Sequence, residues 1–208
     1  SSTLRFHGKH ENTKSMISCK NIKIQLDVSL FFMKNIPYGR QSIYKKDLNE
    51  VVKSLSNDLI TTGPYVKKFE NLIKKTLKAK FALTCTSGTA ALHLAFMSIN
   101  LKKEDVIILP IINFIAASNL ASMLQAKIYY ADVCPNTGQM TPETFEACVK
   151  KNKLKNIKAV VTMYLGGNPD NIKNFYYLKK KYKFYLLEDA CHALGSKYIY
   201  NGKIYNVG

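Results

Sequence analysis

From residue 81 onward, two patterns of apolar and polar residues take turns along the chain. Short apolar runs, which are typical of buried strands, alternate with longer segments whose apolar residues recur every three or four positions, as they do in helices. This alternation predicts an α/β fold in three layers, with a mainly parallel sheet covered by helices on both faces. We expect strands over residues 81–86, 106–109, 127–131, 158–164 and 184–188, and helices over residues 88–99, 114–124, 142–150 and 171–183.

Two further helices are expected ahead of this region. The first covers about residues 46–56, and the second begins at Pro64, whose fixed φ suits the first position of a helix. In the second helix the apolar residues fall on one face and lysines on the other, so that one face would pack and the other would contact solvent. The apolar residues are Val66, Phe69, Leu72, Ile73 and Leu77.

The first 34 residues differ from the rest of the chain. They are polar and basic and show no clear periodicity, apart from one short apolar run at residues 28–33. That run is too short and poorly flanked for a signal peptide. We therefore expect residues 1–34 to be a poorly structured leader outside the core, and residues 35–208 to form the folded part.

The charge of the chain is strongly basic. A formal net charge of +17 comes from 31 Lys and Arg against 14 Asp and Glu, and most of the excess is lysine spread along the whole length. A nucleic-acid surface would instead cluster Arg and Lys with interleaved aromatic residues. The charge therefore indicates a compositional bias, and we expect no nucleic-acid partner. A basic binding module stays an alternative, which salt-dependent binding to nucleic acid would reveal.

The five cysteines stand at positions 19, 85, 134, 148 and 191, an odd number with no short paired spacing. Neither a disulfide framework nor a zinc site is indicated by this arrangement. We expect no metal ion and a reducing, cytoplasmic location.

One stretch, residues 106–126, carries no charged side chain and is long enough to span a bilayer. Its interior holds too many polar groups for hydrocarbon, whereas a strand followed by a turn and a helix accounts for the same residues. We therefore expect no membrane association. The residues that argue against a span are Pro110, Asn113, Ser118, Asn119, Ser122 and Gln125.

Residues able to bind a ligand follow three of the expected strands. Ser87-Gly88-Thr89 follows the first, Asn113-Phe114 the second and Asp189 the last. In sheets of this kind, ligands bind beyond the carboxyl ends of the strands. A helix begins at Ser87-Gly88-Thr89, so free amides, hydroxyls and the helix dipole would converge where a phosphate monoester fits. The alternative is a helix cap without a ligand.

Asp189 ends an apolar strand, where an acid is costly unless a cation pairs with it. A protonated pyridine nitrogen would be such a cation, and the carboxylate would keep the ring an electron sink. His192 could hydrogen-bond the phenolic oxygen of that ring, and Phe114 could stack on it. The alternatives are a cap for Asp189, an ordinary half-buried histidine for His192 and a core aromatic for Phe114.

With these residues set out, the chain resembles the sugar aminotransferases of the DegT/DnrJ/EryC1/StrS family. These are pyridoxal 5'-phosphate enzymes of the aspartate aminotransferase fold type I, so the resemblance implies most of a cofactor-binding large domain. The resemblance runs from about Ile36 to Gly208 and rests on several motifs in order. They are Thr62-Gly63-Pro64, Ser87 to His93, Phe114 to Asn119, Gly167-Asn168-Pro169 and Glu188 to Gly195.

The resemblance also implies roles for single residues. Gly88, Thr89 and Ala90 would bind the cofactor phosphate, Phe114 would stack on the ring, Asp189 would pair with the pyridine nitrogen and His192 would contact the phenolic oxygen. The positions that match the nucleotide-sugar pocket of the family are Tyr38, Thr61, Thr62, Gly63 and Ser87.

Residues 36–43 are especially similar to family members of pseudaminic acid synthesis, which use glutamate to aminate C4 of a UDP-linked 4-keto-6-deoxy sugar. The resemblance thus implies a UDP-linked keto sugar and glutamate as substrates, and a homodimer with active sites between the subunits. The family's Ser-Phe-x-x-x-Lys segment, which carries the Schiff-base lysine, would follow soon after Gly208. Lys197 and Lys203 do not match that lysine. We therefore expect an N-terminal fragment that is inactive alone.

Two alternatives within this resemblance stay open. Some family members catalyse dehydration with the same cofactor and carry histidine in place of the lysine, at a position beyond Gly208. A regulatory or binding protein that has no such lysine is the second alternative.

Overall fold

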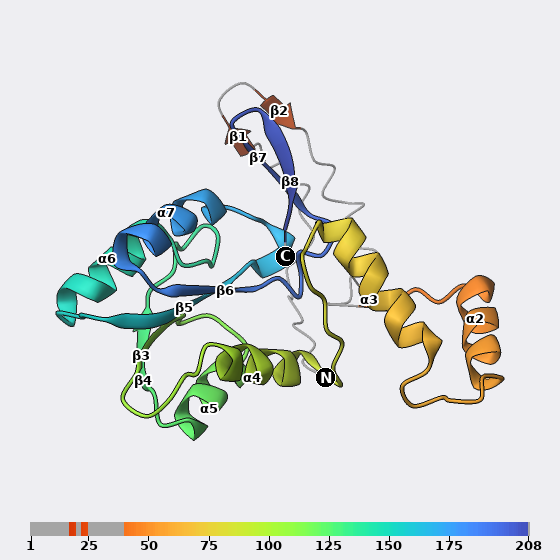
Figure 1. Ribbon diagram of the computed structural model, residues 1–208. Coiled ribbons are helices and arrows are strands. Elements are labelled where there is room, and N and C mark those ends of the chain that lie inside the picture. Colours follow the sequence, from red (N-terminus) through yellow and green to blue (C-terminus); the bar gives the residue numbers. More distant parts are fainter. Residues whose placement is uncertain (1–16, 20–21, 25–39, 208) are drawn as a thin grey trace, which may run out of the picture. The chain divides into compact units, whose positions relative to one another are not determined.

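Four parallel strands form the central sheet, in the order β4-β3-β5-β6. The structure is a computed structural model that describes residues 17–19, 22–24 and 40–207 (Figure 1). The chain divides into two compact units, Ser1–Ser56 and Asn57–Gly208, and the sheet belongs to the second. The strands are β3 (Val106–Pro110), β4 (Lys127–Ala131), β5 (Ile157–Met163) and β6 (Tyr185–Asp189).

Helices cover both faces of this sheet, as Figure 1 shows. On one face lie α6 (Pro142–Lys151) and α7 (Ile172–Tyr182), and on the other lie α4 (Gly88–Ser98) and α5 (Ala116–Met123). The expected three-layer α/β/α arrangement with a parallel sheet is therefore confirmed.

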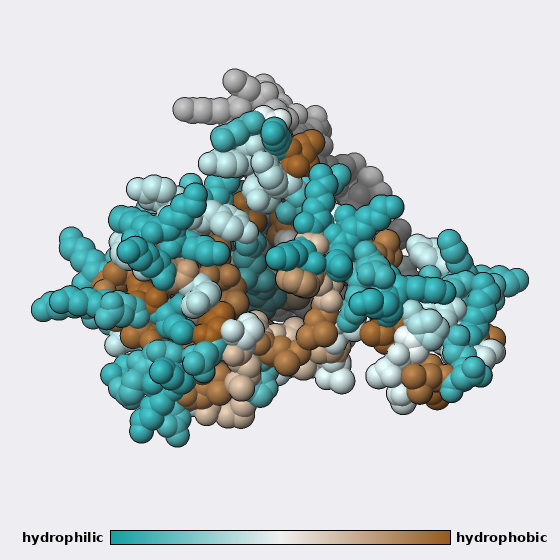
Figure 2. Space-filling view, viewed as in Figure 1, coloured by the Kyte–Doolittle hydropathy of each residue, from teal (hydrophilic) through white to brown (hydrophobic). Residues whose placement is uncertain are grey.

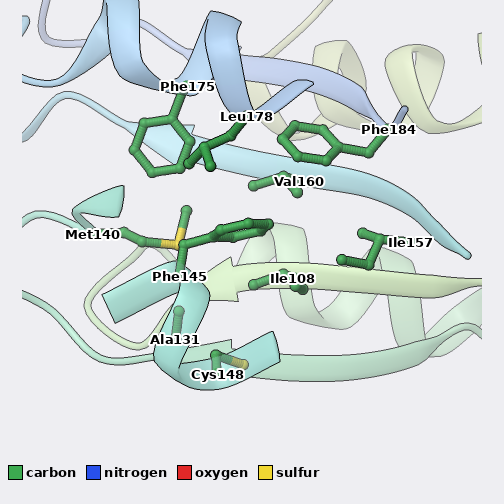
Figure 3. Packing of buried hydrophobic residues seen from close by; sticks show 10 residues of the cluster. All are labelled: Ile108, Ala131, Met140, Phe145, Cys148, Ile157, Val160, Phe175, Leu178 and Phe184. Atoms are coloured by element: carbon green, nitrogen blue, oxygen red, sulfur yellow. The ribbon is translucent and has the colours of Figure 1, made fainter. Parts of the chain in front are cut away.

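Two separate cores lie on the two faces of the sheet. Successive side chains of a strand point to opposite faces, so each central strand contributes to both. On the α6 and α7 side, Phe145 packs edge-on to Phe175 with ring centroids 6.2 Å apart, in one cluster with Ile108 and Val160 (Figure 3). The core on the other face includes Phe96, Ile107, Leu109, Ala121 and Val161.

The expected strand over residues 81–86 is wrong, whereas the other four expected strands and all the expected helices are confirmed with small shifts at their ends. The segment has no regular structure, and no strand pairs with it within the part of the chain that the structure describes. Phe81 and Leu83 are 78% and 75% exposed. The segment is held instead by Thr84, whose amide and hydroxyl both donate to Glu70 Oε1 at 3.1 Å. An apolar run becomes a strand only where a neighbouring strand accepts its backbone hydrogen bonds.

Within the described residues, the second unit contains four more elements. Helix α3 (Pro64–Leu77) begins at Pro64, as expected, and β7 (Lys197–Tyr200) pairs with β8 (Lys203–Asn206) as an antiparallel hairpin. The short helix η1 (Leu165–Gly167) follows β5.

In the first unit, α2 (Lys45–Leu55) begins after Tyr44, whose amide donates to Asp47 at 2.8 Å. Strands β1 (Ile17–Cys19) and β2 (Ile22–Ile24) pair antiparallel inside the stretch expected to be a leader. The rest of that stretch lies outside the described residues.

The visible surface is largely hydrophilic, and Figure 2 shows hydrophilic residues spread widely over it, with apolar residues between them. Among the described residues, no helix is long and apolar enough to cross a membrane. Within the same residues, no group of His, Cys, Asp and Glu is placed to hold a metal ion.

Candidate cofactor site

Strand β6 ends in two acidic residues whose side chains project to opposite faces of the sheet. Leu187 packs in the core on the α4 and α5 side, so Asp189, two residues further, lies on that same face. Leu186 packs in the core on the α6 and α7 side, and Glu188 shares that face. The sequence therefore assigns the two carboxylates to different surroundings, and only Asp189 faces the layer that contains α4.

Helix α4 presents its N-terminus at the edge of the sheet where the strands end. The helix leads directly into the start of β3, so it runs opposite to the strands and begins at their carboxyl ends. Ser87 caps it, because the Ser87 Oγ accepts a hydrogen bond from the Ala90 amide at 3.1 Å. The amides of Gly88 and Thr89 have no partner among the described residues, and the space beside Gly88 is open. Two free donors and the positive helix end therefore meet on the Asp189 face.

The resemblance implies that Ala90 binds the cofactor phosphate, but its amide is already used. It already donates to Ser87, so the capping bond occupies one of the three amides expected to bind phosphate. The amides of Gly88 and Thr89 make no such bond within the described residues.

Asp189 begins a tight turn that fixes its carboxylate. The Oδ1 atom accepts from the Cys191 amide at 3.2 Å, and the Asp189 carbonyl accepts from the Tyr164 amide at 3.3 Å. Burial, followed by the hydrogen bond to Asp189, raises the pKa of the Cys191 thiol to about 11. His192 lies in the same turn and is exposed. Asp189 is thus held at the end of β6 by two hydrogen bonds. The Tyr164 amide binds its backbone carbonyl, and the Cys191 amide binds its side-chain carboxylate.

The glycine-rich turn after β5 packs against the turn that begins at Asp189. Gly167 adopts a φ of +81°, and a Cβ at this position would lie 2.6 Å from the His192 carbonyl oxygen. Ser196 Oγ donates to the Gly167 carbonyl at 2.7 Å, which joins the two turns directly. The buried Gln139 side chain donates to the Asn168 carbonyl at 3.0 Å and so ties a third loop to the pair. This role of Gln139 is not evident from the sequence, because no residue near it in the chain indicates that its partner is Asn168.

Phe114 lies at the same edge of the sheet, between the end of β3 and the start of α5. Its side chain is 67% exposed, so the alternative of a core aromatic is wrong. Its amide donates to Asn113 Oδ1 at 2.7 Å, which fixes the backbone just ahead of the helix. An exposed flat ring at this edge can cover a bound aromatic group.

The residues expected to bind the sugar fall into three places. Tyr38 lies outside the described residues, and Ser87 caps α4. Thr61, Thr62 and Gly63 lie just ahead of α3. The other end of α3 contacts β8, and a helix of 14 residues is about 21 Å long, so the structure does not bring these three residues to the turn of Asp189 in the same chain.

These positions fit pyridoxal phosphate by their chemistry. Free amides at a helix N-terminus suit a phosphate group, and a carboxylate on the same face and edge of the sheet suits a protonated ring nitrogen. Residues 41–206 match the DegT/DnrJ/EryC1/StrS aminotransferase family. The chain belongs to this family. Pyridoxal 5'-phosphate is the cofactor that membership of this aminotransferase family indicates.

Similar proteins extend the comparison. A UDP-4-amino-4,6-dideoxy-N-acetyl-beta-L-altrosamine transaminase of Campylobacter jejuni is 34% identical over 163 residues, which cover 78% of this chain and 43% of that protein. Helicobacter pylori PseC, an aminotransferase involved in the biosynthesis of pseudoaminic acid, has a similar structure with a TM-score of 0.73 and 25% identity, covering 84% of this chain and 45% of PseC.

A dehydratase of the same fold is nearly as similar in structure. The E. coli GDP-4-keto-6-deoxy-D-mannose-3-dehydratase has a TM-score of 0.72 and 26% identity, over 81% of this chain and 43% of that enzyme. The family member described here therefore spans less than half of the length of the relatives that it matches.

Proposed function

We propose that the protein to which this chain belongs transfers an amino group from glutamate to C4 of a UDP-linked 4-keto-6-deoxy sugar, with pyridoxal phosphate as cofactor. The observation that carries the proposal is that Asp189 and the free amides of Gly88 and Thr89 share one face and one edge of the sheet. The choice of sugar is supported by the name of the Campylobacter relative and by the description of PseC.

Each residue of the site has a separate task in this proposal. The amides of Gly88 and Thr89 hold the phosphate, while Asp189 keeps a proton on the ring nitrogen. Phe114 covers one face of the ring, and His192 donates to its phenolic oxygen. When bound, pyridoxal phosphate supplies an electron sink that eases removal of a proton from the carbon bearing the nitrogen.

Two parts of the site are proposed to come from elsewhere. The lysine that exchanges protons with the substrate is predicted beyond Gly208. The sugar-binding residues Thr61, Thr62 and Gly63 lie far from Asp189 in one chain, which supports a homodimer in which they serve the partner's site.

The experiment is an assay of the protein expressed from its complete gene, supplied with a UDP-linked 4-keto-6-deoxy sugar and glutamate. The proposal predicts an amino sugar and 2-oxoglutarate in equal amounts. The variant Asp189→Asn should lose nearly all of this activity, whereas Glu146→Gln, which changes an exposed carboxylate paired with Lys181, should not.

A dehydratase is the second candidate, supported by the similarity to the E. coli enzyme. It predicts a deoxygenated product that retains no nitrogen from glutamate. The same assay distinguishes the two, because the nitrogen of ¹⁵N-glutamate enters the sugar only in amino transfer.

A further inference from the structure

Glu188, the residue before Asp189, accepts one hydrogen bond on each of its carboxylate oxygens. Tyr164 donates its hydroxyl to Oε2 at 2.7 Å, and Tyr176 donates its hydroxyl to Oε1 at 2.6 Å. Tyr164 follows β5, and Tyr176 lies on α7, so the carboxylate joins three elements of the fold. No cation forms an ion pair with Glu188 within the described residues.

Tyr164 binds both acidic residues at the end of β6. Its hydroxyl holds the side chain of Glu188 on one face of the sheet, and its amide donates to the carbonyl of Asp189 at 3.3 Å. The side chain is 2% exposed, so it has little freedom to move. Burial, and then the negative charge of Glu188, raise the pKa of the Tyr164 hydroxyl far above its ordinary value, which keeps it a donor.

Two further phenols lie near Glu188, beside the hydroxyl of its register partner Thr162. Tyr176 has its pKa raised by burial and by its hydrogen bond to Glu188, and the pKa of Tyr198 on β7 is raised by burial and by the same carboxylate. Tyr198 stacks on Tyr205 with ring centroids 5.4 Å apart, which holds it in place. The carboxylate is therefore bound by two neutral donors, the buried Tyr164 and the more exposed Tyr176.

The packing of the fold does not by itself require a carboxylate with two tyrosine donors at position 188. On this face Val160 and Leu186 belong to an apolar core, although Thr162, the register partner of Glu188, is polar, and an apolar residue at position 188 would lie beside that core. Replacing a buried polar network by apolar residues of similar volume is often neutral or stabilising. A fully satisfied network instead fixes one orientation, which an apolar contact does less sharply.

We propose that Glu188 is a positioning residue for the cofactor, which acts with Tyr164 and Tyr176 to hold the end of β6 so that the Asp189 carboxylate stays aimed at the ring nitrogen. This inference rests on the proposed function, because it assumes that Asp189 binds the cofactor. Residues that orient a ligand-binding group typically change affinity about 10-fold or more when they are replaced, as the supporting shells of metal sites do.

The test measures binding of pyridoxamine 5'-phosphate to the complete protein by the anisotropy of the ligand's fluorescence. This ligand forms no covalent bond with a lysine, so the measurement reports the phosphate and ring contacts alone. Glu188→Gln and Glu188→Leu should each weaken binding about 10-fold, with Glu188→Leu keeping a melting temperature near that of the wild type. Glu146→Gln is the matched control, since Glu146 also accepts from a tyrosine hydroxyl on α7, that of Tyr182, and should leave the affinity unchanged.

A second measurement distinguishes a change in the orientation of the Asp189 carboxylate from a general loss of folded structure. If the Asp189 carboxylate no longer points at the ring nitrogen, the pKa of that nitrogen should fall. The pH titration of the bound cofactor's absorbance should then shift to lower pH. Tyr176→Phe should shift this titration in the same direction, because it removes one donor at the surface end of the network, and Tyr182→Phe should not. Tyr176→Phe also keeps the test available if both substitutions of Glu188 prevent folding.

The outcomes distinguish the inference from the proposed function. Wild-type protein that does not bind pyridoxamine 5'-phosphate would overturn both. Wild-type binding that Asp189→Asn abolishes, with affinity and titration unchanged in the Glu188 variants and in Tyr176→Phe, would overturn the positioning role alone.

Discussion

Gly167 lies directly beneath the carbonyl oxygen of His192, so closely that a Cβ on Gly167 would stand 2.6 Å from that oxygen. The φ of +81° adds a second obstacle to any side chain. We predict that Gly167→Ala lowers the free energy of unfolding by about 3 kcal/mol, because the clash adds to the backbone strain. The shift of the urea midpoint of the complete protein measures this.

The neighbouring glycine is the control for that substitution. Gly166 has a φ of +66°, but nothing lies within 4 Å of its Cβ position. Gly166→Ala should therefore cost only the backbone strain, about 1 kcal/mol. Equal losses in the two variants would show that the contact with His192 is unimportant.

Ser87→Ala removes the side chain that caps α4. The Ala90 amide then loses its acceptor, so we predict a loss of about 1 kcal/mol in the free energy of unfolding. Ser98→Ala, at the other end of the same helix, removes only a hydroxyl that donates to the Ala95 carbonyl at an exposed site and should change stability by less than about 0.5 kcal/mol. Urea unfolding followed by circular dichroism compares the two variants.

The cysteines should differ in reactivity with pH. The pKa of Cys134 is lowered, chiefly by hydrogen bonds from the backbone of Asn136 and Thr137, whereas that of Cys191 is raised to about 11. At pH 8 about one Cys191 thiol in a thousand is then ionised, and the thiolate is the form that reacts. We predict that iodoacetamide modifies Cys134 much faster than Cys191, as measured by peptide mass spectrometry.

Asp189→Asn provides the control for the cysteine prediction. It removes the negative charge that raises the Cys191 pKa, so alkylation of Cys191 should become faster, while the larger effect of burial remains. A wild-type Cys191 that reacts as fast as Cys134 would contradict the described turn.

The tyrosines around Glu188 should stay protonated in strongly alkaline solution. The pKa of Tyr164 and that of Tyr176 are raised in the folded protein, whereas in the unfolded chain both phenols ionise at about pH 10. The free energy of unfolding should therefore fall as the pH rises above about 10, where only the unfolded state loses these protons. Ultraviolet titration should count the same number of phenolates in folded Tyr164→Phe and in folded wild type, because Tyr164 stays protonated in the folded protein. In urea, the variant should give one phenolate fewer than the wild type.

The sheet could be predicted from the sequence because each of its four strands is a short apolar run between helical segments. The same rule failed at residues 81–86, because an apolar run does not show whether a neighbouring strand exists to pair with it. The positions of Asp189 and Gly88 could be predicted because parallel strands and their helices place such residues at one edge of the sheet.

The supporting contacts of the site could not be predicted in this way. Gln139 reaches the turn after β5, and Glu188 reaches Tyr176 on α7, through contacts that depend on how separate elements pack. The exposure of Phe114 is of the same kind, since an aromatic residue after a strand is found both in cores and at surfaces. Local sequence predicts the groups proposed to face the cofactor, whereas tertiary packing determines which residues hold those groups in place.

The most direct test of the cofactor site compares the affinities of the complete protein for pyridoxamine 5'-phosphate and for pyridoxamine, in the wild type and in Asp189→Asn. The two free amides of α4 and the carboxylate of Asp189 predict that removing the phosphate and removing the charge each weaken binding at least about 10-fold. Equal affinity for the two ligands, or an Asp189→Asn variant that binds pyridoxamine 5'-phosphate as tightly as the wild type, would contradict the site described here.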